Sequence, residues 1–336
     1  MSTRTLILTG AVLAAGALLT ACGGKIGENN AAPSSQSSGG GAASGNKNLE
    51  LVVGVKNEPF YISMQCGAEA AAKSAGYTLN TQAPDKFDPT LQGPIVTALG
   101  AKKPAALLIA PTDDKTMAPQ MKTIKDMGVK IIEVDTALQD TSVAASSISS
   151  DNTQGGKLAA QTIAKLTSGK TGSVLVLDTK AGTSTTAARA KGFEEELKTA
   201  APNLKSIGIQ FTDNEPAVAA QKVTAAISST PDLIGVFATN LNTGEGAATG
   251  LRSAGKVGQV QLVGFDASPS EVEGLKNGAF QALIAQDPAT IGKVGVEQAV
   301  NAIEGKSVQR NISAPLVALT KDDMTNKAEF FYKTKC

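Results

Sequence analysis

Polar side chains that can accept or donate hydrogen bonds follow almost every short, apolar, β-rich run of this 336-residue chain. They are Glu58, Thr112, Asp113, Asp135, Thr183, Asn214, Asn240, Asp266 and Gln286. Carboxylates accept hydrogen bonds and amides do both, so such a set could hold a polar small molecule. Two carboxylates, such as Asp135 and Asp266, could also form the acid pair of a glycosidase. We expect binding and not hydrolysis.

The composition excludes several kinds of chemistry. The chain has no histidine, which removes serine–histidine and cysteine–histidine catalysis and histidine metal sites. Its three cysteines form no CxxC pair, so we expect neither a metal site nor a redox site. Its 31 basic and 30 acidic residues give no excess charge for nucleic acid. We therefore predict a protein that is not an enzyme and needs no cofactor.

The elements that must position the polar residues alternate along the chain. The predicted strands are residues 50–55, 77–80, 105–110, 130–135, 173–178, 206–211, 233–238, 260–266 and 281–285. The helices predicted between them include residues 64–74, 153–166, 186–199, 217–228, 243–254, 269–277 and 289–304. Continuous apolar strands separated by helices indicate parallel sheets covered on both faces.

Nine strands exceed one typical sheet, so we predict an α/β fold with two doubly wound, parallel-sheet lobes. The break between them falls near residues 148–152. In such sheets ligands bind at the carboxyl ends of the strands. Two facing lobes would therefore form a cleft lined by the polar residues of both.

The first 48 residues predict an export signal and a tether. Arg4 precedes an apolar run from residue 6 to 19, too short for a confident membrane span. The run ends in Leu19-Thr20-Ala21-Cys22, which resembles the bacterial lipobox. We expect a signal peptide over residues 1–21, a lipid on Cys22, and a flexible Gly/Ser-rich linker over residues 22–48. The alternative is a plain secretory signal with an incidental cysteine.

From about residue 49 to 320 the chain resembles the type I periplasmic sugar-binding proteins of ATP-binding-cassette (ABC) importers. The resemblance lies in ordered segments such as Asn57-Glu58-Pro59-Phe60-Tyr61, Val134-Asp135, Ser150-Asp151-Asn152, Ala181-Gly182-Thr183-Ser184 with Arg189, Val236-Phe237-Ala238-Thr239-Asn240, Val263-Gly264-Phe265-Asp266 and Ala285-Gln286-Asp287-Pro288. It implies a multi-strand hinge, an N-terminal lobe of residues 49–150 and 287–315, and a C-terminal lobe of residues 151–286 and 316–336. It also implies an extracytoplasmic monomer, held at the membrane by its lipid, that binds a small neutral sugar or polyol and delivers it to an ABC permease.

The resemblance implies roles for eight residues. Phe60 and Tyr61 would stack on a sugar ring, while Asp135, Arg189, Asn240, Asp266 and Gln286 would bind its hydroxyls. Glu58 stands where an amide is expected, and its role is the least defined. Gly54, Ala110, Thr136 and Asn214 replace a serine, an asparagine, an arginine and an aromatic residue. These departures favour a linear polyol, a cyclitol or another sugar over ribose, and the surplus of carboxylates disfavours an anionic sugar.

Each residue also has a structural alternative. Phe60 and Tyr61 could be core aromatics, and Arg189 could lie on a helix surface. Asp135 and Asp266 could cap helices, Asn240 could lie in a turn, and Gln286 could bind backbone at a hinge. Cys66 and Cys336 could either pair in a disulfide, as exported thiols tend to, or remain free.

Three other functions are open to such a chain. A sensor would present its ligand to a membrane receptor and not to a permease. A transcription regulator would need an N-terminal helix-turn-helix, which residues 1–48 do not offer. An anchored enzyme is disfavoured by the missing histidine.

Overall fold

A computed structural model describes residues 46–336. The predicted signal peptide of residues 1–21, the lipidation site Cys22 and the linker up to residue 45 lie outside the described residues. The structural findings below concern the described part of the chain alone.

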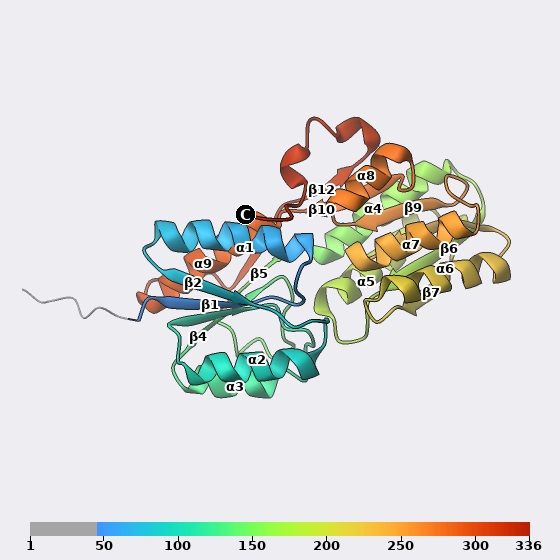
Figure 1. The fold of residues 1–336 in the computed structure, drawn as a ribbon. Coiled ribbons are helices and arrows are strands. Elements are labelled where there is room, and N and C mark those ends of the chain that lie inside the picture. The colour runs from blue at the N-terminus through green and yellow to red at the C-terminus, as the bar shows by residue number, and fades with distance from the viewer. Residues whose placement is uncertain (1–45) are drawn as a thin grey trace, which may run out of the picture. The chain divides into compact units, whose positions relative to one another are not determined.

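The first lobe is a six-stranded parallel sheet between two helix layers (Figure 1). Its strands, in spatial order, are β11 (Asn311–Ala314), β5 (Ser146–Ser150), β4 (Lys130–Val134), β3 (Ala106–Ile109), β1 (Asn48–Val52) and β2 (Thr78–Gln82). Helices α1 (Pro59–Ser74) and α9 (Pro288–Ile303) pack together on one face, and α2 (Pro89–Ala101) and α3 (Ala118–Asp126) cover the other.

The second lobe repeats this architecture. Its sheet has the order β12 (Leu316–Leu319), β10 (Ala282–Gln286), β9 (Gln261–Phe265), β8 (Leu233–Ala238), β6 (Gly172–Asp178) and β7 (Leu204–Phe211). All its pairings are parallel except that of β12 with β10. The helices are α4 (Asn152–Thr167), α5 (Ser184–Ala200), α6 (Pro216–Ser229), α7 (Leu241–Ser253) and α8 (Pro269–Asn277). The predicted α/β class with two mainly parallel sheets is thus confirmed.

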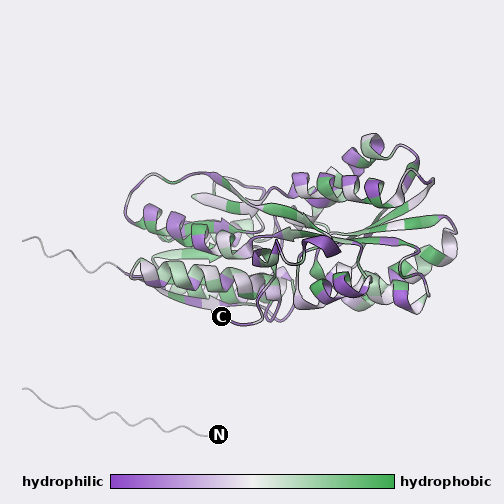
Figure 2. Cartoon of the chain, turned by 90° about the horizontal axis from the view of Figure 1, so that it is seen from above, coloured by the Kyte–Doolittle hydropathy of each residue, from purple (hydrophilic) through white to green (hydrophobic). Residues whose placement is uncertain are grey.

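The strands carry the apolar core, as Figure 2 shows by their hydrophobic colouring between helices with polar outer faces. β3 and β6 are buried along their whole length. This burial explains why β3 is apolar throughout and β6 is apolar from Val174 to Leu177, since a strand covered on both faces cannot alternate with polar residues.

The chain passes between the two sheets at three places within residues 46–336: after β5, after β10, and between β11 and β12. The C-terminal tail then runs through two short 3₁₀ helices, η1 (Lys321–Asp323) and η2 (Ala328–Phe330). It ends at Cys336, which is joined by a disulfide to Cys66 on α1.

Several elements differ from the prediction. Helix α1 begins at Pro59 and not at residue 64, because proline is well accommodated in the first turn of a helix. β1 begins at Asn48, which the prediction gave to the linker. β5, β11 and β12 were not among the predicted strands. β11 and β12 have only four residues each, and Pro315 separates them. α2 and α3 were not among the predicted helices either, and Pro94 interrupts the helical pattern of α2.

Candidate functional site

A cavity between the two sheets collects the polar strand ends. It contains about 370 Å³ of space free of protein atoms, counted out to its open side. Its lining comprises Glu58, Phe60, Tyr61, Phe87, Asp135, Thr136, Thr183, Thr185, Thr186, Arg189, Asn214, Asn240, Asp266 and Gln286. All eight residues predicted to bind ligand are among them; their contact with a ligand remains a prediction.

The two central carboxylates sit at matching positions in the two lobes. Asp135 directly follows β4, and Asp266 directly follows β9. Both are almost fully buried, and both have a positive φ, of 66° and 100° respectively. Residues other than glycine rarely adopt such φ values, and they persist only where surrounding contacts hold them. Neither residue is the N-cap of the helix that follows it in the chain, since those caps are Asp151 for α4 and Ser268 for α8. Asp266 nevertheless accepts the backbone N–H of Leu241, the first residue of α7, and so satisfies one donor at the start of that helix.

Asp266 is held by neighbours on three sides. Its Oδ1 accepts hydrogen bonds from Gln286 Nε2 at 2.7 Å and from the Tyr332 hydroxyl at 2.8 Å. Its Oδ2 accepts from the backbone N–H of Leu241, the first residue of α7, at 2.9 Å. The N-terminus of a helix carries partial positive charge, which attracts the carboxylate oxygen to this position. The carboxylate therefore meets the cavity in a fixed orientation.

Arg189 is the cation of the cavity lining and is 2% exposed. Its Nε donates to Asn152 Oδ1 at 2.8 Å, and its two terminal nitrogens donate to the Thr239 carbonyl at 2.9 Å and to Gln286 Oε1 at 3.0 Å. The guanidinium carbon lies 3.7 Å from the ring centre of Phe265, a cation–π contact. Arg189 is therefore not a surface residue. Two of its five N–H groups remain for other acceptors.

Glycines on two crossing helices place Arg189. A Cβ added to Gly156 on α4 would come within 2.0 Å of the Arg189 carbonyl oxygen, and one on Gly192 of α5 within 2.2 Å of the Thr153 carbonyl. The absence of side chains at these two positions lets α4 and α5 approach closely. Arg189 can consequently reach Asn152 at the start of α4.

Aromatic residues form one wall of the cavity. Phe60 and Tyr61 lie in the first turn of α1 with their rings edge to face, and the Tyr61 hydroxyl donates to Asp135 Oδ2 at 3.0 Å. Phe87, in the loop between β2 and α2, also lines the cavity and was not predicted. A Cβ on Gly54 would come within 2.4 Å of the Tyr61 hydroxyl oxygen and 2.6 Å of the Phe87 ring. Glycine at position 54 therefore makes room for both aromatic side chains.

Glu58 lines the cavity and connects the two lobes through a hydrogen bond. It precedes α1, and its Oε2 accepts a hydrogen bond from Asn242 Nδ2 on α7 at 3.1 Å. Withdrawal from water, followed by repulsion from Asp266 and Asp135, raises the pKa of the Glu58 carboxyl to about 8. Withdrawal from water likewise raises the pKa of Asp135 to about 6, against the opposing attraction of Arg189. At neutral pH Glu58 is mostly protonated and can donate a hydrogen bond as well as accept one.

The remaining amides have structural partners too. Asn240 is the N-cap of α7, with its Oδ1 accepting from the Thr243 N–H, while its Nδ2 donates to Asn214 Oδ1 at 2.8 Å. Asn240 is thus a helix cap and not only a turn residue. Gln286 ends β10 and accepts from Ser150 Oγ across the hinge at 3.0 Å. Its side chain joins the Arg189 and Asp266 networks, so it serves the hinge and the cavity together.

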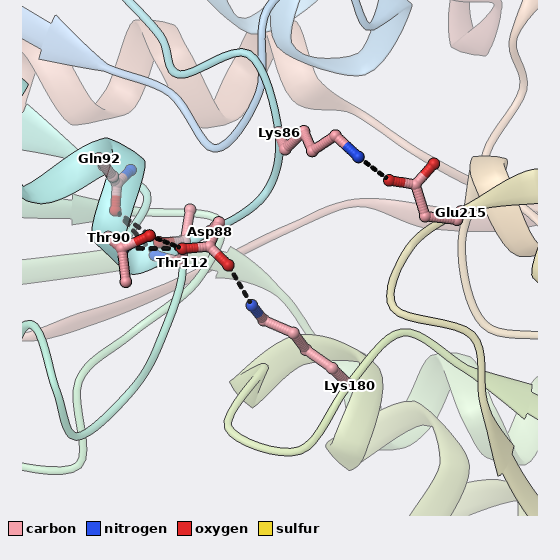
Figure 3. Close-up of polar contacts among 7 residues, drawn as sticks. All are labelled: Lys86, Asp88, Thr90, Gln92, Thr112, Lys180 and Glu215. Carbon is pink, nitrogen blue, oxygen red and sulfur yellow. Dashed lines mark hydrogen bonds and ion pairs between the residues drawn. The ribbon is translucent and has the colours of Figure 1, made fainter.

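Two ion pairs, which Figure 3 shows, connect the two lobes beside the cavity; one has its lysine in the first lobe and the other in the second. Lys86 of the first lobe lies 2.7 Å from Glu215 of the second, and Lys180 of the second lies 3.6 Å from Asp88 of the first. These residues line an outer groove that meets the cavity at Phe87 and Asn214. Within residues 46–336, the two lobes are therefore in contact with each other at the entrance to the cavity.

Two further findings concern residues 46–336. They hold no group of three or more cysteine or acidic side chains arranged to bind a metal ion. They also contain no helix that is both long and apolar enough to span a bilayer.

The chain is similar to known proteins along nearly its whole folded part. Residues 49–307 match the family model of the periplasmic binding protein domain. The ribose import binding protein RbsB of Salmonella typhimurium is 32% identical over 279 residues, which cover 83% of this chain and 92% of that protein. The xylitol-binding protein of Mycolicibacterium smegmatis is 26% identical over 319 residues, 94% of this chain and 86% of that protein.

Solved structures agree with this similarity. A solute-binding protein of an ABC transporter from Agrobacterium vitis, bound with α-D-tagatopyranose, has a TM-score of 0.82 and 37% sequence identity. The match covers 85% of this chain and 99% of that one. A carbohydrate transporter solute-binding protein from Agrobacterium radiobacter, in complex with D-arabinose, has a TM-score of 0.81 and 26% identity, over 85% and 98% of the two chains.

Proposed function

Since this chain belongs to the periplasmic binding protein family, as a type I sugar-binding, solute-binding protein of the ABC-transporter class, we propose that its inter-lobe cavity binds one uncharged sugar or polyol. The observation that carries the proposal is the convergence of eight predicted side chains, from strand and helix ends of both lobes, on one cavity. The ligand would lie between the lobes and be desolvated as they close.

The polar groups fit a compact polyhydroxylated molecule. Asp135 and Asp266 can each accept hydrogen bonds from neighbouring hydroxyls, and the free N–H groups of Arg189 can donate to hydroxyl oxygens. Each of these groups is buried, so a ligand lacking one matching hydroxyl would leave a buried group unpaired and would bind much more weakly. Phe60 and Phe87 supply apolar surface for the C–H faces of a ring or chain.

The charges of the cavity favour an uncharged ligand. Asp135 and Asp266 face one cation, Arg189, whose N–H groups are already partly engaged by protein. Glu58, mostly protonated at neutral pH, adds no positive charge to balance them. Adding an anionic sugar would increase the surplus of negative charge in a poorly hydrated site. We propose that sugar acids are excluded for this reason.

We further propose that the protein is exported and anchored through a lipid on Cys22, with lobes bounded near residues 150, 286 and 315, and works as a monomer. The lipobox-like segment and the Gly/Ser-rich stretch that follows it support the anchor. Metabolic labelling with a fatty acid should mark the wild type and leave a Cys22→Ala variant unlabelled.

A thermal-shift screen tests the ligand class. Residues 46–336 would be heated with D-ribose, D-allose, D-tagatose, D-arabinose or xylitol, and with D-glucuronate as the anionic comparison. A true ligand present at one hundred times its dissociation constant adds about 2.7 kcal/mol to the free energy of unfolding. We expect at least one uncharged compound to raise the midpoint by several degrees and glucuronate to leave it unchanged. Stabilisation by glucuronate alone would contradict the proposal.

A further inference from the structure

Tyr332, in the C-terminal tail, forms hydrogen bonds with the polar residues of the cavity from the side that faces away from the cavity. It does not line the cavity, and it is 5% exposed. Its hydroxyl donates to Asp266 Oδ1 at 2.8 Å and accepts from the backbone N–H of Gln286 at 3.2 Å. One phenol group therefore holds a side chain and a backbone segment that both belong to the proposed site.

The same residue also contacts the first lobe. The rings of Tyr332 and Phe60 meet edge to face, with centres 5.8 Å apart. The backbone N–H of Tyr332 donates to the Ala267 carbonyl at 2.9 Å, and the next residue, Lys333, donates its N–H to Ser63 Oγ on α1 at 2.7 Å. Between positions 332 and 333 the tail thus changes its partners from the second lobe to the first.

The disulfide fixes this path. Cys336 is bonded to Cys66 on α1, 270 residues earlier in the chain. Four residues can span at most about 14 Å even when fully extended. Tyr332 consequently cannot move far from α1 while the disulfide is intact. This holds although the tail that carries Tyr332 starts at the end of β12, in the second lobe, and is long and mostly irregular.

The arrangement matters because Asp266 depends on its contacts for its conformation. Asp266 has a φ of 100°, which a residue with a side chain keeps only when its contacts hold it. Its Oδ1 has two partners, Gln286 and Tyr332. Removing the phenol hydroxyl would leave Oδ1 with one donor and would free the Gln286 N–H from its acceptor.

We infer that Tyr332 is a positioning residue of the sugar site: tethered through the Cys66–Cys336 bond, it fixes the orientation of Asp266 and Gln286 toward the ligand. The inference rests on the proposed function for its effect on affinity. Its effect on Asp266 and Gln286 exists in the ligand-free protein as well.

Tyr332→Phe tests the hydroxyl while keeping the ring. The matched control is Tyr77→Phe, because Tyr77 lies outside the cavity and its hydroxyl has no hydrogen bond to another described residue. Isothermal titration with D-tagatose, D-ribose and xylitol would be run at a temperature well below the unfolding midpoint and would give the dissociation constants. We expect Tyr332→Phe to raise the dissociation constant about tenfold, as the loss of one charge-assisted hydrogen bond predicts, and Tyr77→Phe to stay within about twofold.

A second readout separates positioning from general stability and needs no ligand. Hydrogen–deuterium exchange at the Gln286 amide should accelerate in Tyr332→Phe, while exchange in β3, in the core of the first lobe, should not. The double variant Cys66→Ser/Cys336→Ser keeps the hydroxyl but removes the tether. It should accelerate the same amide and raise the dissociation constant, by less than Tyr332→Phe does.

The outcomes distinguish the two proposals. If no compound binds the wild type but exchange at Gln286 accelerates in Tyr332→Phe, the ligand class is wrong and the positioning role stands. If the wild type binds and Tyr332→Phe binds equally well, the inference is overturned while the proposed function stands. Unchanged exchange at Gln286 in both variants would also overturn it.

Discussion

Individual side chains in this cavity are bound to one another before any ligand arrives. Asp266, Gln286 and Arg189 form a continuous chain of hydrogen bonds, and Tyr61 holds Asp135. Pre-organised partners lose little side-chain freedom on binding, which is how a small ligand can reach useful affinity with few contacts. The orientation of the side chains that line the cavity therefore depends on neighbouring residues as much as on the lining residues themselves.

Asp266→Asn should weaken sugar binding about 100-fold. The substitution keeps the shape of the side chain but removes the charge, and it offers an N–H₂ group where hydroxyl donors would point. Titration calorimetry with the best compound of the thermal-shift screen measures the loss. Asp322→Asn, an exposed position on η1, is the control and should bind like the wild type. Equal affinities for the two variants would remove Asp266 from the site.

Glu58 should make the ligand-free protein less stable as pH rises from about 4.5 to 8. Its pKa in the folded state, about 8, exceeds the ordinary value of 4.5, so the folded state holds this proton more tightly than the unfolded chain does. This contribution is complete below pH 4.5 and is lost as pH approaches 8. Asp135, with a pKa of about 6, acts in the same direction over a lower range.

The Glu58→Gln variant isolates that effect. It resembles the protonated acid and should flatten the fall of the unfolding midpoint between pH 6 and 8. The exposed Glu273→Gln variant on α8 should keep the slope of the wild type. A Glu58→Gln curve parallel to that of the wild type would mean that Glu58 is ionised in the folded protein at neutral pH.

The sequence predicts which residues line the cavity better than it predicts which residues form hydrogen bonds with one another. Polar residues at the ends of strands, together with the family resemblance, pointed to eight residues that all line the cavity. Phe87 was missed because it lies five residues beyond the end of β2, in a loop without periodicity. Tyr332 was missed because its site lies 46 and 66 residues away along the chain, and no local pattern reports a tail folding back.

At the scale of elements, the close packing of helices sets where the site residues lie. Gly156 and Gly192 allow α4 and α5 to touch through their backbones. The same device recurs in the first lobe, where a Cβ on Gly292 of α9 would come within 2.0 Å of the Met64 carbonyl oxygen on α1. Each lobe thus positions a site-bearing helix, α5 or α1, against a partner helix at a glycine contact.

Gly156→Ala should separate α4 from α5 and weaken both the fold and the site. The added methyl group meets backbone that cannot rotate away, and overpacking of this kind costs about 1–3 kcal/mol. Chemical denaturation would measure the loss, and titration would show weaker binding through the displaced Arg189. Gly93→Ala on α2 is the control, since its Cβ would lie 3.4 Å from the nearest atom, the end of the Gln120 side chain. Equal stability in both variants would contradict this account.

The elements themselves were predictable where the pattern was long and regular. The helices and strands that were predicted in both lobes appear within about five residues of their predicted places. β11 and β12 escaped prediction because a four-residue strand carries too little pattern, and because their pairing partners, β5 and β10, are far away in the sequence. Their importance for linking the lobes comes from topology, which local sequence does not encode.

On the scale of the whole folded part, the two lobes meet through the hinge crossings, the tail and the mouth of the cleft. The mouth is held by exposed ion pairs, which contribute little individually. They connect opposite lobes, so any contribution they make applies to the closed arrangement alone. A ligand would add to this closed state by its own contacts with both lobes.

Lys86→Ala should therefore weaken ligand binding slightly, by about two- to threefold, as expected for one exposed ion pair. The effect should shrink in 1 M salt, where screening leaves a Debye length of about 3 Å. Lys102→Ala, exposed at the end of α2, is the matched control. An effect of Lys86→Ala that is independent of salt would show that the ion pair is not its cause.

A crystal structure of residues 46–336, grown with the compound that stabilises the protein most, tests the central claim most directly. The account predicts density for one uncharged sugar or polyol between the lobes, with its hydroxyls within hydrogen-bond distance of Asp135, Arg189 and Asp266. A compound bound elsewhere on the surface, with the inter-lobe cavity filled only by water, would contradict it.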